Sequence, residues 1–129
     1  MPFEHVHHVK YTVSDMDRSI AFYTEVLGLK LLSNNFDEEH QEKYAFLALE
    51  GANLELVQAL AHPFAAPELR PPYCPHLALT TDDMETTLEM IEKRSIPVVK
   101  GPLEIPGEVK WVYLRDPDNN VIEFVEWEK

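Results

Sequence analysis

Two histidines and two glutamates recur at one spacing along this chain of 129 residues. The step along the sequence from His8 to His76 equals the step from Glu55 to Glu123, so each glutamate follows its histidine at the same separation. Two imidazole nitrogens and two carboxylates suit Zn²⁺, Ni²⁺, Co²⁺, Mn²⁺ or Fe²⁺, whereas Ca²⁺ and Mg²⁺ prefer oxygen ligands alone. The pattern predicts one divalent transition metal held by His8, Glu55, His76 and Glu123.

These four residues lie in longer segments that match when the sequence is shifted so that His8 falls on His76, a shift called the duplication offset below. The segment HVKYTVSDMDRSIAFY, from His8, matches HLALTTDDMETTLEMI, from His76, and NLELV, from Asn53, matches VIEFV, from Val121. Identical ionisable residues at one offset, inside matching apolar patterns, indicate a tandem duplication. The two halves should therefore place their His and Glu residues at equivalent positions.

The other histidines and the single cysteine have no partner of their own type at this offset. Strand alternation would turn His7 away from the face of His8, so only His8 is expected to be a ligand. His40 and His62 are expected to be ordinary loop residues. Cys74 is expected to be a buried structural thiol, because no basic neighbour in the sequence would activate it.

Each half contains the same series of expected elements. A β-branched strand is followed by a helix whose apolar residues recur every three or four positions, and then by three more strands. The three later strands are expected around residues 30–34, 44–49 and 53–59, and around residues 98–100, 110–115 and 121–126. Ser14 with Asp17, and Asp82 with Glu85, fit capping boxes at the two helix starts. The expected fold class is α+β, with a βαβββ module present twice.

One domain spanning residues 1–129 is expected. Module one covers about residues 4–59 and module two about residues 75–127. The crossover of about residues 60–74 contains several prolines, which exclude a regular helix or a central strand there.

A homodimer is also expected, since two such modules expose sheet edges and the long crossover could reach a partner. In that arrangement, His8 and Glu55 of one subunit would face His76 and Glu123 of the other. The alternative is that both modules of one chain complete the site.

The composition excludes several classes of protein. Twenty-three acidic residues against eleven basic ones give a formal charge of −12, which repels nucleic acids and anionic membranes. No apolar run approaches the ~18 residues of a membrane helix. The N-terminal segment lacks the pattern of a signal peptide, and one cysteine cannot form an internal disulfide. A cytoplasmic protein with a small-molecule substrate is expected.

Four segments resemble the vicinal oxygen chelate superfamily, in particular its glyoxalase I (lactoylglutathione lyase) branch. They are HVKYTVSDMDRSIAFYTEVLGLKLL, LELVQ, PHLALTTDDMETTLEMIEKRSIPV and LRDPDNNVIEFVE, which together span nearly the whole chain. The resemblance implies that paired βαβββ modules form a cup-shaped mixed sheet around one divalent metal.

The resemblance also implies a reaction. The ligand positions of the family correspond to His8, Glu55, His76 and Glu123, with Glu123 as the proton-transferring base and Glu55 as its partner. A Lewis-acidic ion would stabilise an enediolate while a carboxylate moves the adjacent proton. The implied activity is a metal-dependent lyase or isomerase acting on a small oxygen-rich substrate.

The sequence departs from the glyoxalase I branch where that branch typically has an arginine that grips a glutathione carboxylate. Thr12 occupies that position, so glutathione is expected to be a poor thiol partner. Arg18, Arg70 and Arg115 are the candidates for binding an anionic substrate group.

Two alternatives remain open. One is a ring-cleaving, extradiol-type dioxygenase of the same fold, which would need two His and one carboxylate and would leave Glu55 without a ligand role. The other is a metal-free module that binds a small molecule or an antibiotic.

Overall fold

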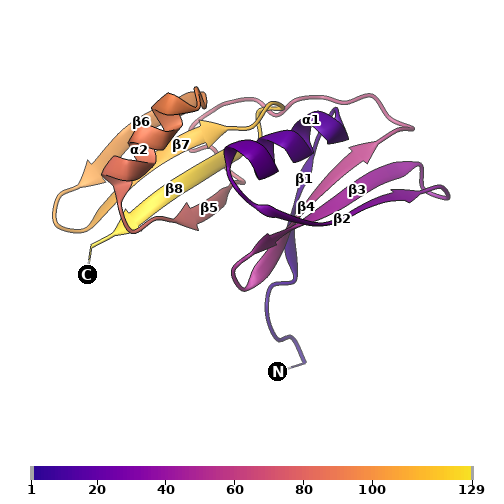
Figure 1. Cartoon of the computed structure of the whole chain (residues 1–129), viewed down its shortest axis with the longest axis horizontal. Coiled ribbons are helices and arrows are strands. Elements are labelled where there is room, and N and C mark those ends of the chain that lie inside the picture. The colour runs from indigo at the N-terminus through magenta and orange to yellow at the C-terminus, as the bar shows by residue number, and fades with distance from the viewer. Residues whose placement is uncertain (1, 129) are drawn as a thin grey trace. The chain divides into compact units, whose positions relative to one another are not determined.

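The computed structural model describes residues 2–128 and contains two compact units that divide between Ala66 and Pro67. Each unit is a four-stranded mixed sheet with a helix on one face (Figure 1). The order strand, helix, strand, strand, strand occurs once in each unit. The prediction of an α+β fold built from a duplicated βαβββ module is confirmed.

The first unit has the strand order β1-β4-β3-β2. Its elements are β1 (His8–Thr12), α1 (Met16–Ala21), a π-helical turn η1 (Phe22–Val26), β2 (Lys30–Asp37), β3 (Glu42–Leu49) and β4 (Ala52–Ala59). Strand β1 runs parallel to β4, and the other neighbouring strands are antiparallel. The parallel pairing places β1, the first strand of the module, beside β4, its last strand.

The second unit repeats this topology with the order β5-β8-β7-β6. Its elements are β5 (Leu77–Thr80), α2 (Met84–Lys93), β6 (Val98–Ile105), β7 (Val109–Arg115) and β8 (Val121–Trp127). Strand β5 is parallel to β8, as β1 is to β4. The first and last strands of both modules are therefore paired in the same way.

Both α-helices begin one residue later than the capping boxes predicted. The N-caps are Asp15 and Asp83 rather than Ser14 and Asp82. The carboxylate of Asp83 accepts hydrogen bonds from the Thr86 hydroxyl at 2.8 Å and from the Thr86 backbone N–H at 3.2 Å. These hydrogen bonds favour the ionised form and lower the pKa of Asp83.

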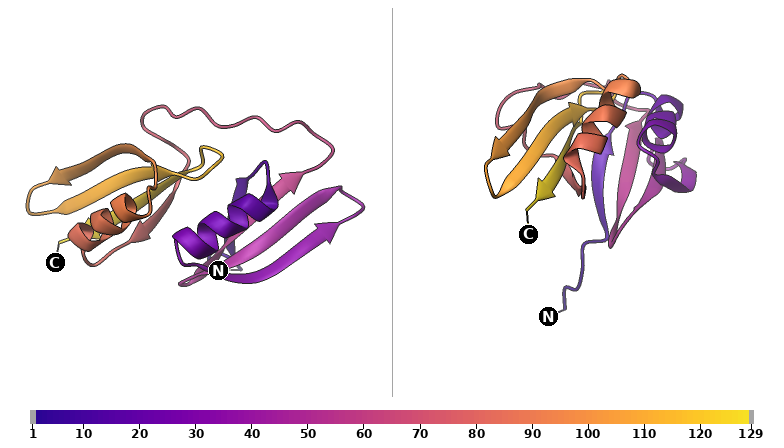
Figure 2. Two further views of the ribbon diagram at one scale, coloured as in Figure 1. Left: turned by 45° about the horizontal axis from the view of Figure 1, so that its top comes forward. Right: turned by 60° about the vertical axis from the view of Figure 1, so that its left-hand side comes forward.

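Each unit has its own apolar core between the helix and the inner face of its sheet, and Figure 2 shows this helix-on-sheet arrangement from two further directions. Fully or nearly buried side chains include Tyr11, Val13, Met16, Tyr23, Leu47, Leu54 and Leu56 in the first unit, and Leu77, Met84, Ile91, Val112, Leu114 and Ile122 in the second. Because side chains alternate along a strand, the residues between these apolar ones face the other side of each sheet. That outer face carries the predicted ligands.

The turn of residues 116–120, before β8, is organised by a buried aspartate. One carboxylate oxygen of Asp116 accepts the backbone N–H of Asp118 at 2.8 Å and that of Asn120 at 2.9 Å, and the other accepts the Asn120 side-chain amide at 2.9 Å. Asp116 is 1% exposed. This segment lies between the expected strands of residues 110–115 and 121–126, and these hydrogen bonds fix where β8 begins.

Replacing Asp116 with alanine should therefore destabilise the second unit. The change leaves buried N–H donors without an acceptor, which costs about 1–3 kcal/mol. Urea denaturation of Asp116→Ala against the wild-type chain measures the loss. Asp82→Ala, at an exposed position, is the control and should change the free energy of unfolding little. Equal stability of Asp116→Ala and wild type would contradict this account of the turn.

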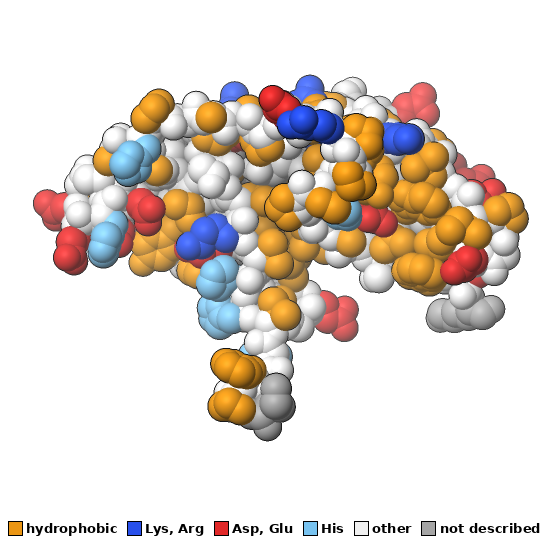
Figure 3. Space-filling view, turned by 180° about the vertical axis from the view of Figure 1, so that it is seen from behind, with side chains coloured by type: hydrophobic (Ala, Val, Ile, Leu, Met, Phe, Trp, Pro, Cys, Tyr) orange, Lys and Arg blue, Asp and Glu red, His pale blue; other side chains and the backbone are white. Residues whose placement is uncertain are grey.

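The surface carries many acidic side chains, as expected from the formal charge of −12. Acidic side chains are spread over the face shown in Figure 3 and do not form one patch. From residue 60 to residue 76 the chain forms no helix or strand, as its prolines predict. Within residues 2–128, none of the helices has the length and apolar character needed to cross a membrane.

Candidate metal centre

The second unit brings His76 and Glu123 into direct contact. His76 Nε2 lies 2.7 Å from Glu123 Oε1, and both side chains are largely buried. The other ring nitrogen, Nδ1, lies 2.8 Å from the backbone carbonyl oxygen of Tyr73. A carbonyl oxygen only accepts, so Nδ1 carries the hydrogen. A distance of 2.7 Å between Nε2 and a carboxylate oxygen is that of a hydrogen bond, so a hydrogen also lies between Nε2 and Glu123 Oε1.

The first unit contains the equivalent pair. His8 Nε2 lies 3.2 Å from Glu55 Oε1, and the Glu55 side chain is 10% exposed. His8 Nδ1 lies 2.8 Å from Nδ1 of His7, so one of these two rings donates a hydrogen bond to the other. The prediction that His7 faces away from His8 is wrong. Strand β1 begins at His8, and alternation therefore does not govern the residue before it.

Strand register explains why the two pairs are alike. Glu55 on β4 lies opposite Lys10 on β1, and Glu123 on β8 lies opposite Ala78 on β5. In each unit the histidine stands two residues before that partner, at or just before the start of the first strand. Residues two apart on a strand share a face. The parallel pairing thus brings each histidine beside its glutamate, at equivalent positions in the two units.

An aromatic ring from the middle strand packs against each histidine. Phe46 lies opposite Glu55, and Tyr113 lies opposite Glu123. Edge-to-face contacts join the Phe46 and His8 rings, with centroids 5.7 Å apart, and the Tyr113 and His76 rings, with centroids 5.5 Å apart. The rings limit the orientation of each imidazole. No pattern in the sequence distinguishes Phe46 and Tyr113 from the other aromatic residues of the chain.

The surroundings of the pair also affect the ionisation of the Tyr113 phenol. Burial, and then the negative charge of Glu123, raise the pKa of Tyr113 above its ordinary value. The ring of Tyr73 lies 4.9 Å from that of Tyr113, centroid to centroid. The Tyr113 ring, with the Tyr73 ring packed against it, therefore lies beside His76 and Glu123.

One difference separates the two pairs. The ammonium nitrogen of Lys10 lies 3.4 Å from Glu55 Oε1, the same oxygen that His8 contacts. The residue at the equivalent position of the second unit is Ala78. Glu55 therefore has a cationic neighbour on its own sheet face that Glu123 lacks at the matching position.

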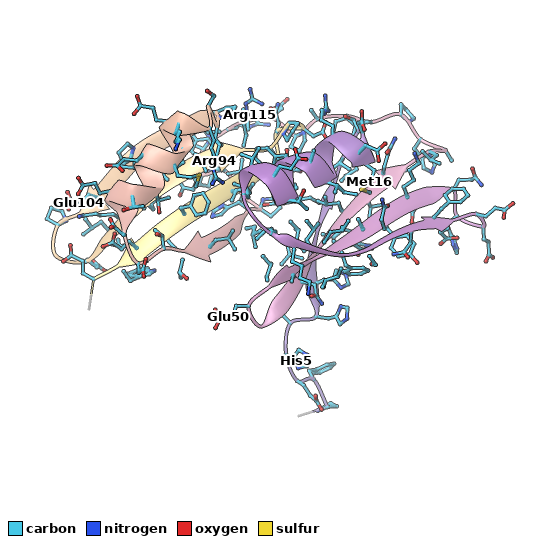
Figure 4. All side chains as sticks on the ribbon, viewed as in Figure 1. His5, Met16, Glu50, Arg94, Glu104 and Arg115 are labelled. Atoms are coloured by element: carbon cyan, nitrogen blue, oxygen red, sulfur yellow. The ribbon has the colours of Figure 1, made fainter. Side chains whose placement is uncertain are left out.

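The other residues singled out from the sequence lie elsewhere. Cys74 is exposed rather than buried, because it precedes β5 in the Pro-rich segment. His40 pairs with Asp37, 2.8 Å away, in an exposed turn. His5 belongs to the segment before β1 and projects away from the sheet (Figure 4).

The three arginines predicted to bind an anionic group are engaged in other contacts. Arg18 donates a hydrogen bond to Ser14 at the start of α1, Arg70 pairs with Glu68, and Arg115 donates to the backbone oxygen of Asp116. The cation that lies beside a predicted ligand is Lys10.

Among residues 2–128, no group of three or more His, Cys, Asp or Glu side chains is arranged to hold a metal. The predicted ligands are present as two separate pairs, one in each unit. Each pair offers one imidazole nitrogen and one carboxylate, which is half of a four-ligand transition-metal set.

Comparison with known families agrees with the topology. The family model of the Glyoxalase/Bleomycin resistance protein/Dioxygenase superfamily matches residues 5–124. The chain belongs to this superfamily. The match includes both modules and all four predicted ligands.

Curated relatives within the superfamily bear the name of one enzyme. The chain is 32% identical over 130 residues to the lactoylglutathione lyase of Haemophilus influenzae, covering 92% of this chain and 90% of that protein. It is 28% identical over 121 residues to a probable lactoylglutathione lyase of Vibrio cholerae, covering 92% and 88%. It spans 35% of the length of a probable chloroplastic lactoylglutathione lyase from Arabidopsis thaliana, to which it is 31% identical.

Solved structures with this fold are more varied in name. A glyoxalase family protein from Enterococcus faecalis is 26% identical, with a TM-score of 0.80 and coverage of 98% of this chain and 100% of that one. TnmS3, an antibiotic-binding protein from Streptomyces sp. CB03234, is 28% identical, with a TM-score of 0.74 and coverage of 99% of both chains. The fold is therefore shared by proteins of different named functions.

Proposed function

We propose that this protein is a divalent-metal-dependent lyase or isomerase that acts on a small oxygen-rich substrate. His8, Glu55, His76 and Glu123 hold the metal in this proposal. The observation that carries it is the repeated pair: each module sets one histidine against one glutamate, by the same strand register, on the sheet face opposite its helix.

The donor set fits a transition-metal ion. Two imidazoles and two carboxylates compensate a double positive charge and leave positions for substrate oxygens. The Tyr73 carbonyl orients the His76 ring so that Nε2 faces Glu123, and a metal ion would replace the hydrogen between these two atoms. A divalent ion held there would act as a Lewis acid toward a substrate oxygen.

Glu123 is the residue that we assign as the base. Glu123 has no lysine at the matching strand position, whereas Glu55 contacts both His8 and Lys10. A carboxylate with fewer cationic contacts is better placed to accept and return a proton beside a carbonyl group. Glu55 acts in this proposal as the partner that completes the ligand set.

The set needs both units, so we propose that residues 1–129 function as one domain. The set is completed either within one chain or between two chains of a homodimer, in which His8 and Glu55 of one subunit meet His76 and Glu123 of the other. We favour the dimer, since each four-stranded sheet has two edge strands, β1 and β2 in the first unit and β5 and β6 in the second, to which another chain could pair. The cytoplasm remains the expected location.

A metal-free binding module is the second candidate. It is favoured by the similarity to TnmS3, which is named as an antibiotic-binding protein. Such a module would need no paired ligands, and the retention of a His–Glu pair in each unit favours the metal-dependent enzyme.

Proton exchange tests the proposed chemistry without knowledge of the natural substrate. The metal-loaded protein should exchange the carbon-bound protons of small α-hydroxyketones, such as hydroxyacetone, with D₂O, as followed by proton NMR. Removal of the metal should stop the exchange, and Glu123→Gln should slow it about 10²–10⁴-fold, the usual contribution of a positioned base. Exchange that is absent from metal-loaded protein, or unchanged after metal removal, would contradict the proposal.

A further inference from the structure

Lys10 contacts the predicted ligand Glu55, and none of the roles assigned so far accounts for a lysine at this position. Alternation along β1 places His8, Lys10 and Thr12 on one face of the sheet, and Lys10 is the residue opposite Glu55. Its ammonium nitrogen and His8 Nε2 approach the same oxygen, Glu55 Oε1, at 3.4 Å and 3.2 Å. A cation is thus placed directly beside one end of the ligand set.

The duplication shows that a cation is not required to build a pair of this kind. Ala78 occupies the matching position opposite Glu123, and His76 still contacts Glu123 at 2.7 Å. Lys10 is therefore a feature of one half only, in a chain whose formal charge is −12. A structural contribution to the fold of the module would be needed in both halves.

The role of Lys10 in a metal-loaded site depends on the charges of the metal ion and of the Glu55 carboxylate beside it. A divalent ion bound to the Glu55 carboxylate would compete with Lys10 for the negative charge of that carboxylate. Two cations that share one carboxylate oxygen repel each other, and water around the half-exposed lysine weakens this repulsion without removing it. The repulsion is relieved when an additional anion lies close to both, and a half-exposed lysine side chain, 54% accessible, is free to turn toward one.

We propose that Lys10 is an anion-binding subsite beside the metal ligands, and that the substrate carries a carboxylate or phosphonate-type group next to its chelating oxygens. This inference rests on the proposed function for the neighbouring ligands. It adds the substrate class: a short anionic hydroxy or keto compound, whose charged group lies one or two bonds from the oxygens that bind the metal. In this proposal Lys10 binds the charged group of the substrate and transfers no proton.

Three small probes test the subsite by calorimetry. Glycolate, hydroxymethylphosphonate and the neutral glycolamide share one hydroxymethyl group and differ in the charged group. Each is titrated into metal-loaded and metal-free protein, for wild type, Lys10→Met and Lys43→Met. Lys43 lies on the same sheet with an exposed side chain, and its strand partner is Gln58 rather than Glu55, so it faces the other side.

Lys10→Met should weaken binding of at least one anionic probe about fivefold or more, the value of one exposed charge pair, and should leave glycolamide unchanged. Lys43→Met should change none of the three. The anion with the larger loss, carboxylate or phosphonate, identifies the group that Lys10 recognises. Absence of metal binding would refute the proposed function, while a charge-dependent loss in metal-free protein would still support the subsite. Equal losses for charged and neutral probes, or no loss in either form of the protein, would overturn it.

Discussion

Substituting either residue of the second pair, as His76→Ala or Glu123→Ala, should lower the affinity for Zn²⁺, Co²⁺ or Ni²⁺ about a hundredfold or more. Even substitutions outside the ligand set commonly cost 10–100-fold in metal affinity, and these remove a proposed ligand. In the His76 variant, Glu123 also loses its contact at 2.7 Å. His8→Ala and Glu55→Ala should have effects of similar size, since the duplication makes the pairs equivalent. Titration in competition with a chromophoric chelator measures the affinity.

The chain supplies a matched control for these variants. His40 also contacts a carboxylate, with Nδ1 2.8 Å from Asp37 Oδ2, but this pair lies in an exposed turn. His40→Ala therefore removes an imidazole from a His–carboxylate pair outside the proposed site and should leave the metal affinity unchanged. Circular dichroism checks that each variant folds. Wild-type affinity in folded His76→Ala would contradict the assignment of this histidine, and so would a comparable loss in His40→Ala.

Turnover of the methylglyoxal–glutathione hemithioacetal should be slow, even though curated relatives bear the name lactoylglutathione lyase. Thr12 lies on the same face of β1 as His8, two residues beyond Lys10, and carries no charge. Compared with an arginine at this position, it lacks a charge-assisted contact worth ~2 kcal/mol, which corresponds to roughly thirtyfold in affinity. The value of kcat/KM should accordingly lie well below the ~10⁶ M⁻¹s⁻¹ of an efficient enzyme.

Thr12→Arg supplies the test within the same fold. It should lower KM for the hemithioacetal roughly thirtyfold and leave kcat nearly unchanged, because uniform binding does not accelerate the chemical step. Thr80→Arg, at the matching position of β5, is the control for adding a charge to the equivalent face. An efficient wild-type enzyme would show that other residues bind glutathione and would contradict the account of Thr12.

The duplicated module could be predicted because its signals are local. Identical residue pairs, apolar periodicity and turn residues occur in the sequence at one offset, and they predicted the element order and the equivalent positions of the His and Glu residues in the two units. The helix caps were placed one residue early, since two consecutive residues in each half, Ser14 with Asp15 and Asp82 with Asp83, are both good N-cap residues. The sequence alone does not rank them.

The surroundings of the pairs could not be predicted in the same way. Phe46 and Tyr113 reach equivalent positions although the duplication offset does not place one on the other, because the hairpin turns before β4 and β8 differ in length. A fixed offset therefore misses them. Cys74 and His7 lie just outside β5 and β1, where strand alternation no longer applies. Lys10 lies two residues after His8 and so shares its strand face, but its contact with Glu55 depends on the parallel register of β1 and β4.

The central claim is that one divalent metal is held by His8, Glu55, His76 and Glu123. Anomalous diffraction from crystals of the Zn²⁺- or Co²⁺-loaded protein, recorded on both sides of the metal absorption edge, tests this most directly. The account predicts one strong anomalous peak per chain, within ~2.0–2.2 Å of a nitrogen of each histidine and an oxygen of each glutamate. The same map shows whether the four ligands come from one chain or from two. A metal-loaded crystal with no peak at these residues, or with its metal bound elsewhere, would contradict the account.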